Sequence, residues 1–301
     1  MRLFSFHKGI RRININRKDL AIPDDGLWWQ VVEQYIPEWK ETLGIDGLWL
    51  PPAQKTPYGD TSTYGYEPYD YYDLGEFLQK ERVRTRYGNR TTLESLIQTA
   101  NNYGIGAVAD IVINHNNGGE LEDNPYVGEP TYTNFMQVAS GRFPRNFTHF
   151  YPCLYGQHDN LAWGNLPDLC HFHPYVHDEL LSYGKWLRDE IGYDGWRFDV
   201  AYGVAPSMII DWALEVGGYS VSEFWNGVPI TNQQIDDALN SVKYSTSAFD
   251  FPLMYEFRTM VMSNGSYDMQ NLATKGLMHT PNKAITFVTN HDTQKDQSDT
   301  V

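Results

Sequence analysis

The chain has 301 residues, of which 41% are apolar and 15% aromatic, and its formal net charge is −15. This length supplies one large α/β domain or two medium ones. The negative charge argues against nucleic acids and anionic membranes as partners. The sequence contains no apolar run of about 18 residues and no signal-peptide pattern, so it predicts no membrane span.

Strand and helix patterns alternate along most of the chain. Apolar runs predict six buried strands at residues 47–50, 107–113, 195–200, 219–222, 248–251 and 284–289, with a less clear strand at 12–16. Helical spacing of apolar residues predicts helices at residues 28–43, 91–103, 176–191, 206–216, 231–242, 255–262 and 269–277. Pro37 predicts a kink or break in the first helix, and Thr91 with Glu94 predicts a capping box at the second.

Residues 116–173 interrupt this alternation. They are rich in Gly, Pro, Asn and aromatic residues and have no long periodic stretch. A segment of this length inside a compact domain is usually functional or a small inserted domain. We therefore expect a barrel segment at 1–115, an inserted domain at 116–173 and the rest of the barrel at 174–301.

The predicted strands are apolar on both faces, which is typical of a parallel α/β sheet. A doubly wound sheet fits this pattern, but a TIM (β/α)8 barrel fits better. Polar residues recur at the ends of successive predicted strands, and in a barrel these ends converge on one site. Because the sequence stops before an eighth strand, we expect the barrel to be incomplete.

Three acids follow predicted strands: Asp199, Glu223 and Asp292. Paired carboxylates perform glycoside hydrolysis, although each acid alone is equally typical of a helix N-cap or a metal ligand. Arg197 lies two residues before Asp199, on the same strand face, and is expected to lower the pKa of that carboxyl. The aromatic residues after Glu223 are expected to raise its pKa through desolvation.

Five stretches resemble, in order, motifs of the alpha-amylase family of glycoside hydrolases: residues 110–115, 166–169, 195–199, 223–225 and 287–292. Residues 26–29, 50–52, 64–70 and 72–75 look most like archaeal and plant-type members. The resemblance covers roughly residues 26 to 294. It implies a retaining α-1,4-glucan hydrolase on a TIM barrel, with an α-glucan as substrate and residues 116–173 as domain B.

The resemblance also implies roles for individual residues. Asp199 matches the nucleophile, Glu223 the acid/base and Asp292 the transition-state stabiliser. Four residues match family residues that contact the sugar beside the nucleophile: Tyr66, His115, Arg197 and His291. Four oxygen donors match calcium ligands of the family: the side chains of Asn114, Asp159 and Asp168 and the carbonyl of Gly203.

The two cysteines, Cys153 and Cys170, leave three alternatives open: a disulfide, a metal site or free thiols. The resemblance implies that zinc is possible near Cys170. It further implies a monomeric extracellular protein, although no signal peptide is recognised in this chain.

Three features depart from the family pattern. Tyr202 stands where these enzymes usually have a Lys that binds the leaving part of the glucan. Residues 1–20 lack the usual first strand, and neither the eighth strand nor the C-terminal β-domain follows Asp292. We therefore expect two open strand edges and a chain that is poorly soluble or inactive by itself. The alternatives for function are a transglycosylase of the same family and a non-catalytic glucan-binding homologue.

Overall fold

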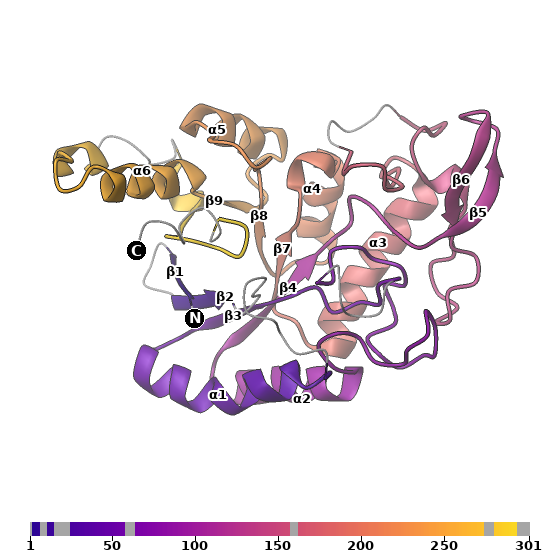
Figure 1. Ribbon diagram of the computed structural model, residues 1–301, viewed down its shortest axis with the longest axis horizontal. Helices are drawn as coiled ribbons and strands as arrows, with labels where there is room; N and C mark the ends of the chain where they lie inside the picture. Colours follow the sequence, from indigo (N-terminus) through magenta and orange to yellow (C-terminus); the bar gives the residue numbers. More distant parts are fainter. Residues whose placement is uncertain are drawn as a thin grey trace.

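Eight strands form a closed barrel in the computed structural model, which describes residues 2–6, 11–14, 25–57, 64–156, 162–273 and 280–293 (Figure 1). Around the barrel the order is β1-β10-β9-β8-β7-β4-β3-β2. The strands are β1 (Arg2–Phe6), β2 (Arg11–Asn14), β3 (Gly47–Leu50), β4 (Gly106–Ile111), β7 (Gly195–Phe198), β8 (Tyr219–Ser222), β9 (Ser247–Phe249) and β10 (Ala284–Thr286). Seven of them, β2 to β10 in this list, are parallel, which confirms the predicted α/β barrel.

The expectation of two open strand edges is wrong. No eighth parallel strand occurs in the described residues, but β1 pairs antiparallel with both β2 and β10 and occupies the gap. Only four residues separate β1 from β2. A parallel strand needs a crossover of about a dozen residues, whereas an antiparallel neighbour can follow a short turn. The short connection therefore explains why the closing strand runs opposite to the others.

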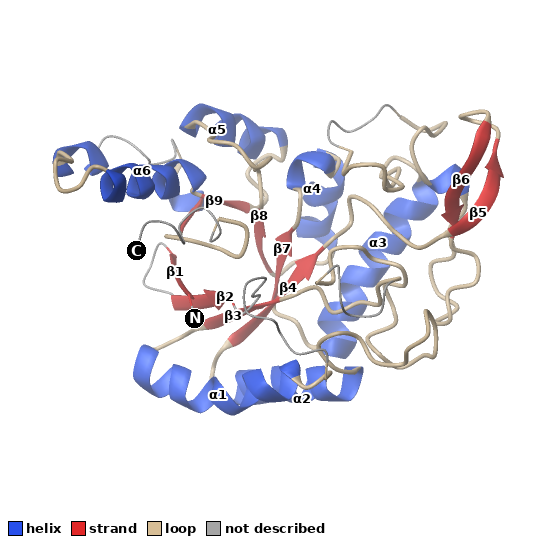
Figure 2. Ribbon diagram, in the orientation of Figure 1, coloured by secondary structure: helices blue, strands red, loops and turns tan. Residues whose placement is uncertain are grey.

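The helices surround the strands (Figure 2). They are α1 (Trp28–Leu43), α2 (Arg90–Asn102), α3 (Pro174–Trp186), α4 (Pro206–Glu215), α5 (Asn232–Ser241) and α6 (Phe251–Met262). Shorter helical turns are Phe147–His149, Leu187–Ile191, Ala201–Gly203, Met269–Ala273 and Pro281–Lys283. Figure 1 shows α1 and α2 side by side along β2 to β4. No helix in the described ranges is long and apolar enough to cross a membrane.

The break predicted at Pro37 is wrong, and so are the residues predicted for the capping box of the second helix. Helix α1 continues through Pro37. Its buried face extends on both sides of the proline, and this packing outweighs the lost backbone hydrogen bond. In α2 the capping box is formed by Asn89 and Thr92 instead of Thr91 and Glu94. The glutamate instead pairs with Arg90, one turn earlier, at 2.6 Å.

A separate two-stranded antiparallel sheet comes after β4 and before α3 in the chain, and it projects away from the barrel (Figure 1). It consists of β5 (Glu120–Asn124) and β6 (Glu129–Asn134). In the same part of the chain a disulfide joins Cys153 to Cys170, which selects one of the three cysteine alternatives. A disulfide sulfur is not a thiolate, so neither cysteine is a zinc ligand in this state.

Candidate active site

The polar residues predicted at the strand ends gather at one end of the barrel. Asp199 directly follows β7 and Glu223 directly follows β8. The backbone N–H of Asp199 donates to the carbonyl of Ile111 on β4 (3.0 Å), and that of Glu223 donates to Phe198 on β7 (3.0 Å). Parallel pairing thus continues past each strand, and it places the two carboxyl groups on neighbouring strand ends.

Arg197 is the centre of the charge cluster, and its side chain is fully buried. Nη1 lies 2.7 Å from Asp110 Oδ1 and 2.5 Å from Asp199 Oδ1, while Nη2 lies 2.5 Å from Glu223 Oε1. One guanidinium therefore holds three carboxyl groups. Nη1 donates hydrogen bonds to Asp110 and Asp199, whereas the contact of Nη2 with Glu223 is an ion pair without hydrogen-bond geometry.

The surrounding carboxyl groups outnumber this one buried cation, and burial raises the pKa of two of them, Glu223 and Asp110. Burial raises the pKa of Glu223 to about 8, although the charge of Arg197 opposes the shift and Asp199 and Asp292 add to it. Burial likewise raises the pKa of Asp110 to about 7. The predicted increase for Glu223 is confirmed, and at neutral pH this carboxyl is a proton donor.

The turn after β7 places backbone and side chain in contact. Val200 has φ 44° and ψ 49°, a left-handed conformation that costs a β-branched residue about 1–3 kcal/mol. Its N–H donates to Glu223 Oε2 at 3.3 Å. The strained turn thereby aims a backbone donor at the oxygen of Glu223 that does not contact Arg197.

Tyr66 and His291 form a second contact pair beside the acids. Their rings are stacked, with centroids 5.5 Å apart at 10°. The Tyr66 hydroxyl donates to Asp110 Oδ2 (2.8 Å) and lies 2.9 Å from His291 Nε2. That same Nε2 is 3.1 Å from Oδ2 of Asp292, whose side chain is 25% exposed. These contacts join Tyr66, His291 and Asp292 into one wall.

His115 contacts the backbone of this wall. Its Nε2 is 2.9 Å from the carbonyl of Tyr66, and burial lowers its pKa. A neutral ring with the proton on Nε2 satisfies that contact. The indole of Trp163 lies parallel to the His115 ring at 12°, with centroids 6.1 Å apart, and is half exposed. Trp163 therefore covers His115 on its solvent side.

A cavity of about 310 Å³ unites these groups. It is lined by Tyr66, His115, Trp163, Asp199, Val200, Glu223, Trp225, Asn226, Gly227, His291 and Asp292. Six of the seven residues predicted for catalysis and sugar contact are among them, and the seventh, Arg197, holds two of the acids. The sequence-based prediction missed Trp163 and Trp225 as lining residues and Asp110 as a member of the charge cluster. A charged residue within the apolar run 107–113 was the available signal for Asp110.

Two of the candidate metal ligands, Asn114 and Asp168, lie beside His115. Asn114 and Asp168 are buried, and Asp168 bridges to the neighbouring His115 through the backbone. The Asn114 carbonyl accepts from the N–H of Leu169 at 2.9 Å. His171 connects this pair to the turn that contains Gly203: its Nε2 lies 2.9 Å from the carbonyl of Ile113, and its Nδ1 accepts from Ala205 N–H at 3.4 Å.

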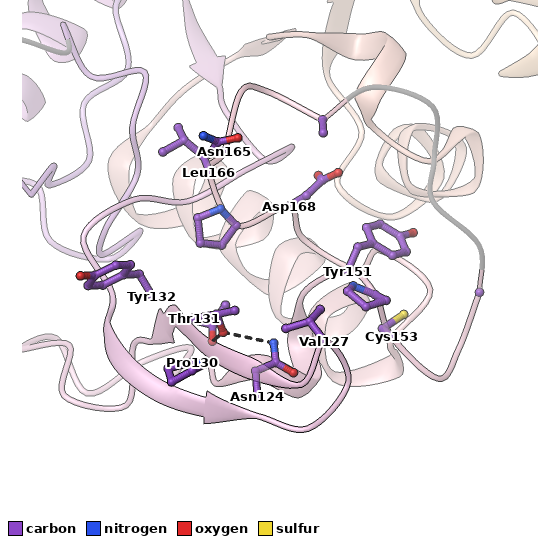
Figure 3. A pocket seen from close by; sticks show the side chains of 15 residues that line it. Asn124, Val127, Pro130, Thr131, Tyr132, Tyr151, Cys153, Asn165, Leu166 and Asp168 are labelled. Atoms are coloured by element: carbon purple, nitrogen blue, oxygen red, sulfur yellow. Dashed lines mark hydrogen bonds between the residues drawn. The ribbon is translucent and has the colours of Figure 1, made fainter.

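These donors fit a hard cation, because an amide oxygen, a carboxylate and a backbone carbonyl are the ligands that calcium prefers. In the described ranges, no three His, Cys, Asp or Glu side chains gather into a metal site. Asp159 lies outside the described residues. A larger cavity, about 710 Å³, lies beside Asp168 and Cys153, between the β5–β6 sheet and residues 151–156 and 162–168 (Figure 3). None of the three predicted catalytic acids lines that cavity.

A barrel that gathers carboxyl groups at its strand ends around a buried arginine is the architecture of a glycoside hydrolase. A sequence profile of the alpha amylase catalytic domain matches residues 34–209. The chain belongs to the alpha-amylase family of glycoside hydrolases.

Several curated relatives resemble the chain over most of its length. The alpha-amylase of Bacillus licheniformis is 30% identical, with 92% of this chain and 62% of the relative covered. The alpha-amylase of Geobacillus stearothermophilus is 32% identical, with coverage of 92% and 59%. The glucan 1,4-alpha-maltohexaosidase of Bacillus sp. strain 707 is 28% identical, with coverage of 97% and 65%. The chain thus spans about three fifths of the length of these relatives.

Solved structures show the same fold. The alpha-amylase from Geobacillus thermoleovorans complexed with acarbose superposes with a TM-score of 0.54 at 22% identity, covering 81% of this chain and 51% of that one. The cyclic alpha-maltosyl-(1→6)-maltose hydrolase from Arthrobacter globiformis superposes with a TM-score of 0.57 at 18% identity, covering 87% and 59%.

Proposed function

We propose that this protein hydrolyses α-1,4-glucosidic bonds within starch-like glucans, with retention of anomeric configuration. The observation that carries this proposal is that the guanidinium of Arg197 forms ion pairs with both Asp199 and Glu223, two acids that line the cavity. A nucleophile and an acid/base must flank one glycosidic bond, and neighbouring strand ends held by one arginine satisfy that requirement.

Two acids divide the chemistry. Asp199, beside the arginine charge, attacks the anomeric carbon and forms a glycosyl-enzyme while the glycosidic bond breaks. Glu223, protonated at neutral pH by its raised pKa, gives its proton to the leaving oxygen. As a carboxylate it then removes a proton from water, which attacks the same carbon and frees Asp199.

The remaining wall residues hold the sugar. Asp292 is the partly exposed carboxylate of the cavity and stabilises the positive charge that develops at the anomeric carbon. His291 and His115 border the space for the sugar, and the Tyr66 ring offers an apolar face for stacking.

A glucan that is cut internally must extend past the cavity. A neighbouring cavity of about 400 Å³ shares Asn226 with the catalytic one. It is lined by Tyr202, Asn226, Val228, Pro229, Ile230, Gln234, Asp237 and Ala238. This continuity supports an internal cleavage site, with Tyr202 as a stacking platform for glucose units beyond the broken bond.

We also propose calcium as a structural cofactor held by Asn114, Asp168 and the carbonyl of Gly203. The charge of a bound calcium would join the domain that contains Asp168 to the strand end at Asn114 and the turn after β7. The Cys153–Cys170 disulfide supports an extracellular location, because disulfides persist in oxidising compartments.

Digestion of maltoheptaose, followed by product chromatography and anomeric NMR, tests the function. The proposal expects shorter products whose new reducing ends are first α. Asp199→Asn should abolish turnover and leave maltoheptaose binding intact, whereas Asp178→Asn, a change at an 81% exposed side chain, should match the wild type. Products longer than the substrate indicate a transglycosylase. Turnover by Asp199→Asn rules out our nucleophile, and binding without turnover by the wild type indicates a glucan-binding protein.

A further inference from the structure

Lys55 is a fully buried lysine in the loop after β3, and the chemistry above does not use it. Its side chain is 1% exposed. The ammonium donates to the carbonyls of Phe77 (3.3 Å) and Arg82 (3.0 Å) and to that of Val83, and it lies 3.3 Å from Oδ2 of Asp73. Four oxygens therefore surround one nitrogen.

This set of oxygens is a cation site. Three backbone carbonyls and a carboxylate are ligands that suit a hard cation, and here the ammonium group takes that place on a covalent tether. Burial lowers the pKa of Lys55, while the charge of Asp73 opposes that shift. Removing one partner of such a buried pair leaves the other uncompensated, so the site depends on a cation.

The backbone of Lys55 and its neighbour hold the segment that contains Tyr66. The Lys55 N–H donates to the carbonyl of Asp73 at 2.8 Å, and its carbonyl accepts from the N–H of Tyr69 at 2.8 Å. The side chain of Gln54 donates to the carbonyl of Gly65 at 2.8 Å. These contacts fix the chain immediately before Tyr66 and three residues after it.

The same cluster extends to the inserted segment after β6. Gln79 Nε2 donates to Asp73 Oδ2 at 2.5 Å and to Asp70 Oδ2 at 2.9 Å. Ser140 donates its hydroxyl to Asp70 Oδ1 at 2.7 Å. A cation at Lys55 Nζ consequently organises both the loop after β3 and its contact with residue 140.

We propose that Lys55 is a positioning residue whose ammonium acts as a tethered cation and holds Tyr66 in the catalytic cavity. Lys55 touches no cavity residue and acts through the 64–83 loop, whose carbonyls and carboxylate converge on it. The inference rests on the proposed function, because it assigns Tyr66 to the sugar-binding wall.

Chemical rescue tests the proposal. Lys55→Ala removes three methylenes and the ammonium, and n-propylammonium has the size and the N–H donors to refill that space. Tetramethylammonium has the same charge and no N–H donor. The control is Lys185→Ala, because Lys185 makes an exposed ion pair with Glu215 and lines neither the cavity nor the loop after β3. We expect kcat/KM of Lys55→Ala on maltoheptaose to fall roughly 10- to 100-fold, as for a displaced contact group. At temperatures below the melting temperature of the variant, n-propylammonium should restore much of the lost kcat/KM, and tetramethylammonium should not.

The proposal would be overturned if Lys55→Ala had the same kcat/KM as the wild type, or if the two ammonium ions had equal effects on the variant. If the variant is recovered only as insoluble protein, refolding is compared in each amine, and recovery that depends on n-propylammonium supports the tethered cation. If the wild type hydrolyses no glucan, the proposed function fails by itself. The melting temperature of Lys55→Ala then tests the cation site separately. If only n-propylammonium raises this temperature, the cation site is supported; if both ions shift it equally, the site is rejected.

Discussion

Asp110 and Arg197 face each other on neighbouring strands β4 and β7, and Oδ1 of the aspartate lies 2.7 Å from Nη1 of the arginine. Because the other oxygen of Asp110 accepts from Trp49 (3.1 Å) and Tyr66 (2.8 Å), one carboxyl connects the arginine to the cavity wall that contains Tyr66. The orientation of Arg197 toward Asp199 and Glu223 therefore depends on a residue that does not line the cavity.

Asp110→Asn should weaken this orientation. If the amide oxygen of the variant still accepts from Tyr66, the amide N–H2 group faces the guanidinium of Arg197, and two donors then oppose each other. We expect kcat/KM on maltoheptaose to fall roughly tenfold or more. Since the charge of Asp110 also raises the pKa of Glu223, the alkaline limb of the pH–rate profile should move to lower pH. Unchanged kcat/KM and an unmoved limb would contradict this role, and Asp189→Asn, a surface change, is the control.

The pH dependence of activity should follow Glu223. Its proton is needed in the first step and is lost as the pH rises through about 8, so kcat/KM should fall on that side. Asp292→Asn removes a charge that raises this pKa and should move the limb downward. Initial rates on a soluble maltooligosaccharide across pH 5 to about 10 give the measurement. A limb that Asp292→Asn leaves in place would speak against Glu223 as the acid.

Stability should respond in the same pH window. The folded-state pKa of Glu223, about 8, exceeds the ordinary value of 4.5, so the folded protein binds the proton more tightly than the unfolded chain. This contribution is complete below pH 4.5 and is lost as the pH rises through 8. Glu223→Gln should reduce that loss, which thermal melts from pH 5 to about 9 would reveal as a flatter slope.

Calcium should bind only to the folded protein. At about 100 times its Kd the ion adds about 2.7 kcal/mol, which corresponds to roughly 4 °C in melting temperature for a domain of this size. A chelator should therefore lower the melting temperature of the wild type. Asp168→Ala should melt lower and respond little to the chelator, while Asp178→Ala should behave as the wild type does. A wild type that is indifferent to chelation would argue against the ion.

Tyr202 should influence which glucans bind well. Its ring packs near Phe224, with centroids 5.5 Å apart at 55°, and borders the cavity next to the catalytic one. Losing one stacking platform costs about 0.5–1.5 kcal/mol, so Tyr202→Ala should raise KM for maltoheptaose roughly two- to tenfold and change KM for maltotriose less. Tyr103→Ala, at the far end of α2, is the control. Equal changes for both substrates would remove Tyr202 from the binding path.

Local patterns predicted much of the barrel. The strands containing Trp49, Val108, Trp196 and Val221 are short apolar runs flanked by turn residues, and this signal does not depend on distant contacts. Capping and helix continuity were less predictable. Asn89 competed successfully with Thr91 as the cap, and buried packing kept α1 intact through Pro37. In both places tertiary or neighbouring contacts outweighed the local rule.

By itself the sequence determined the order of the parallel strands and the presence of acids at their ends, since both follow from apolar spacing and from where each run stops. Only the tertiary structure decided which carboxyl groups form ion pairs with Arg197. Asp110 is 87 residues away in the chain, and strand register alone makes it a partner. The closure of the barrel was decided in the same way. The antiparallel pairing of β1 with β10 joins two distant segments through backbone hydrogen bonds, which no periodicity within either segment records.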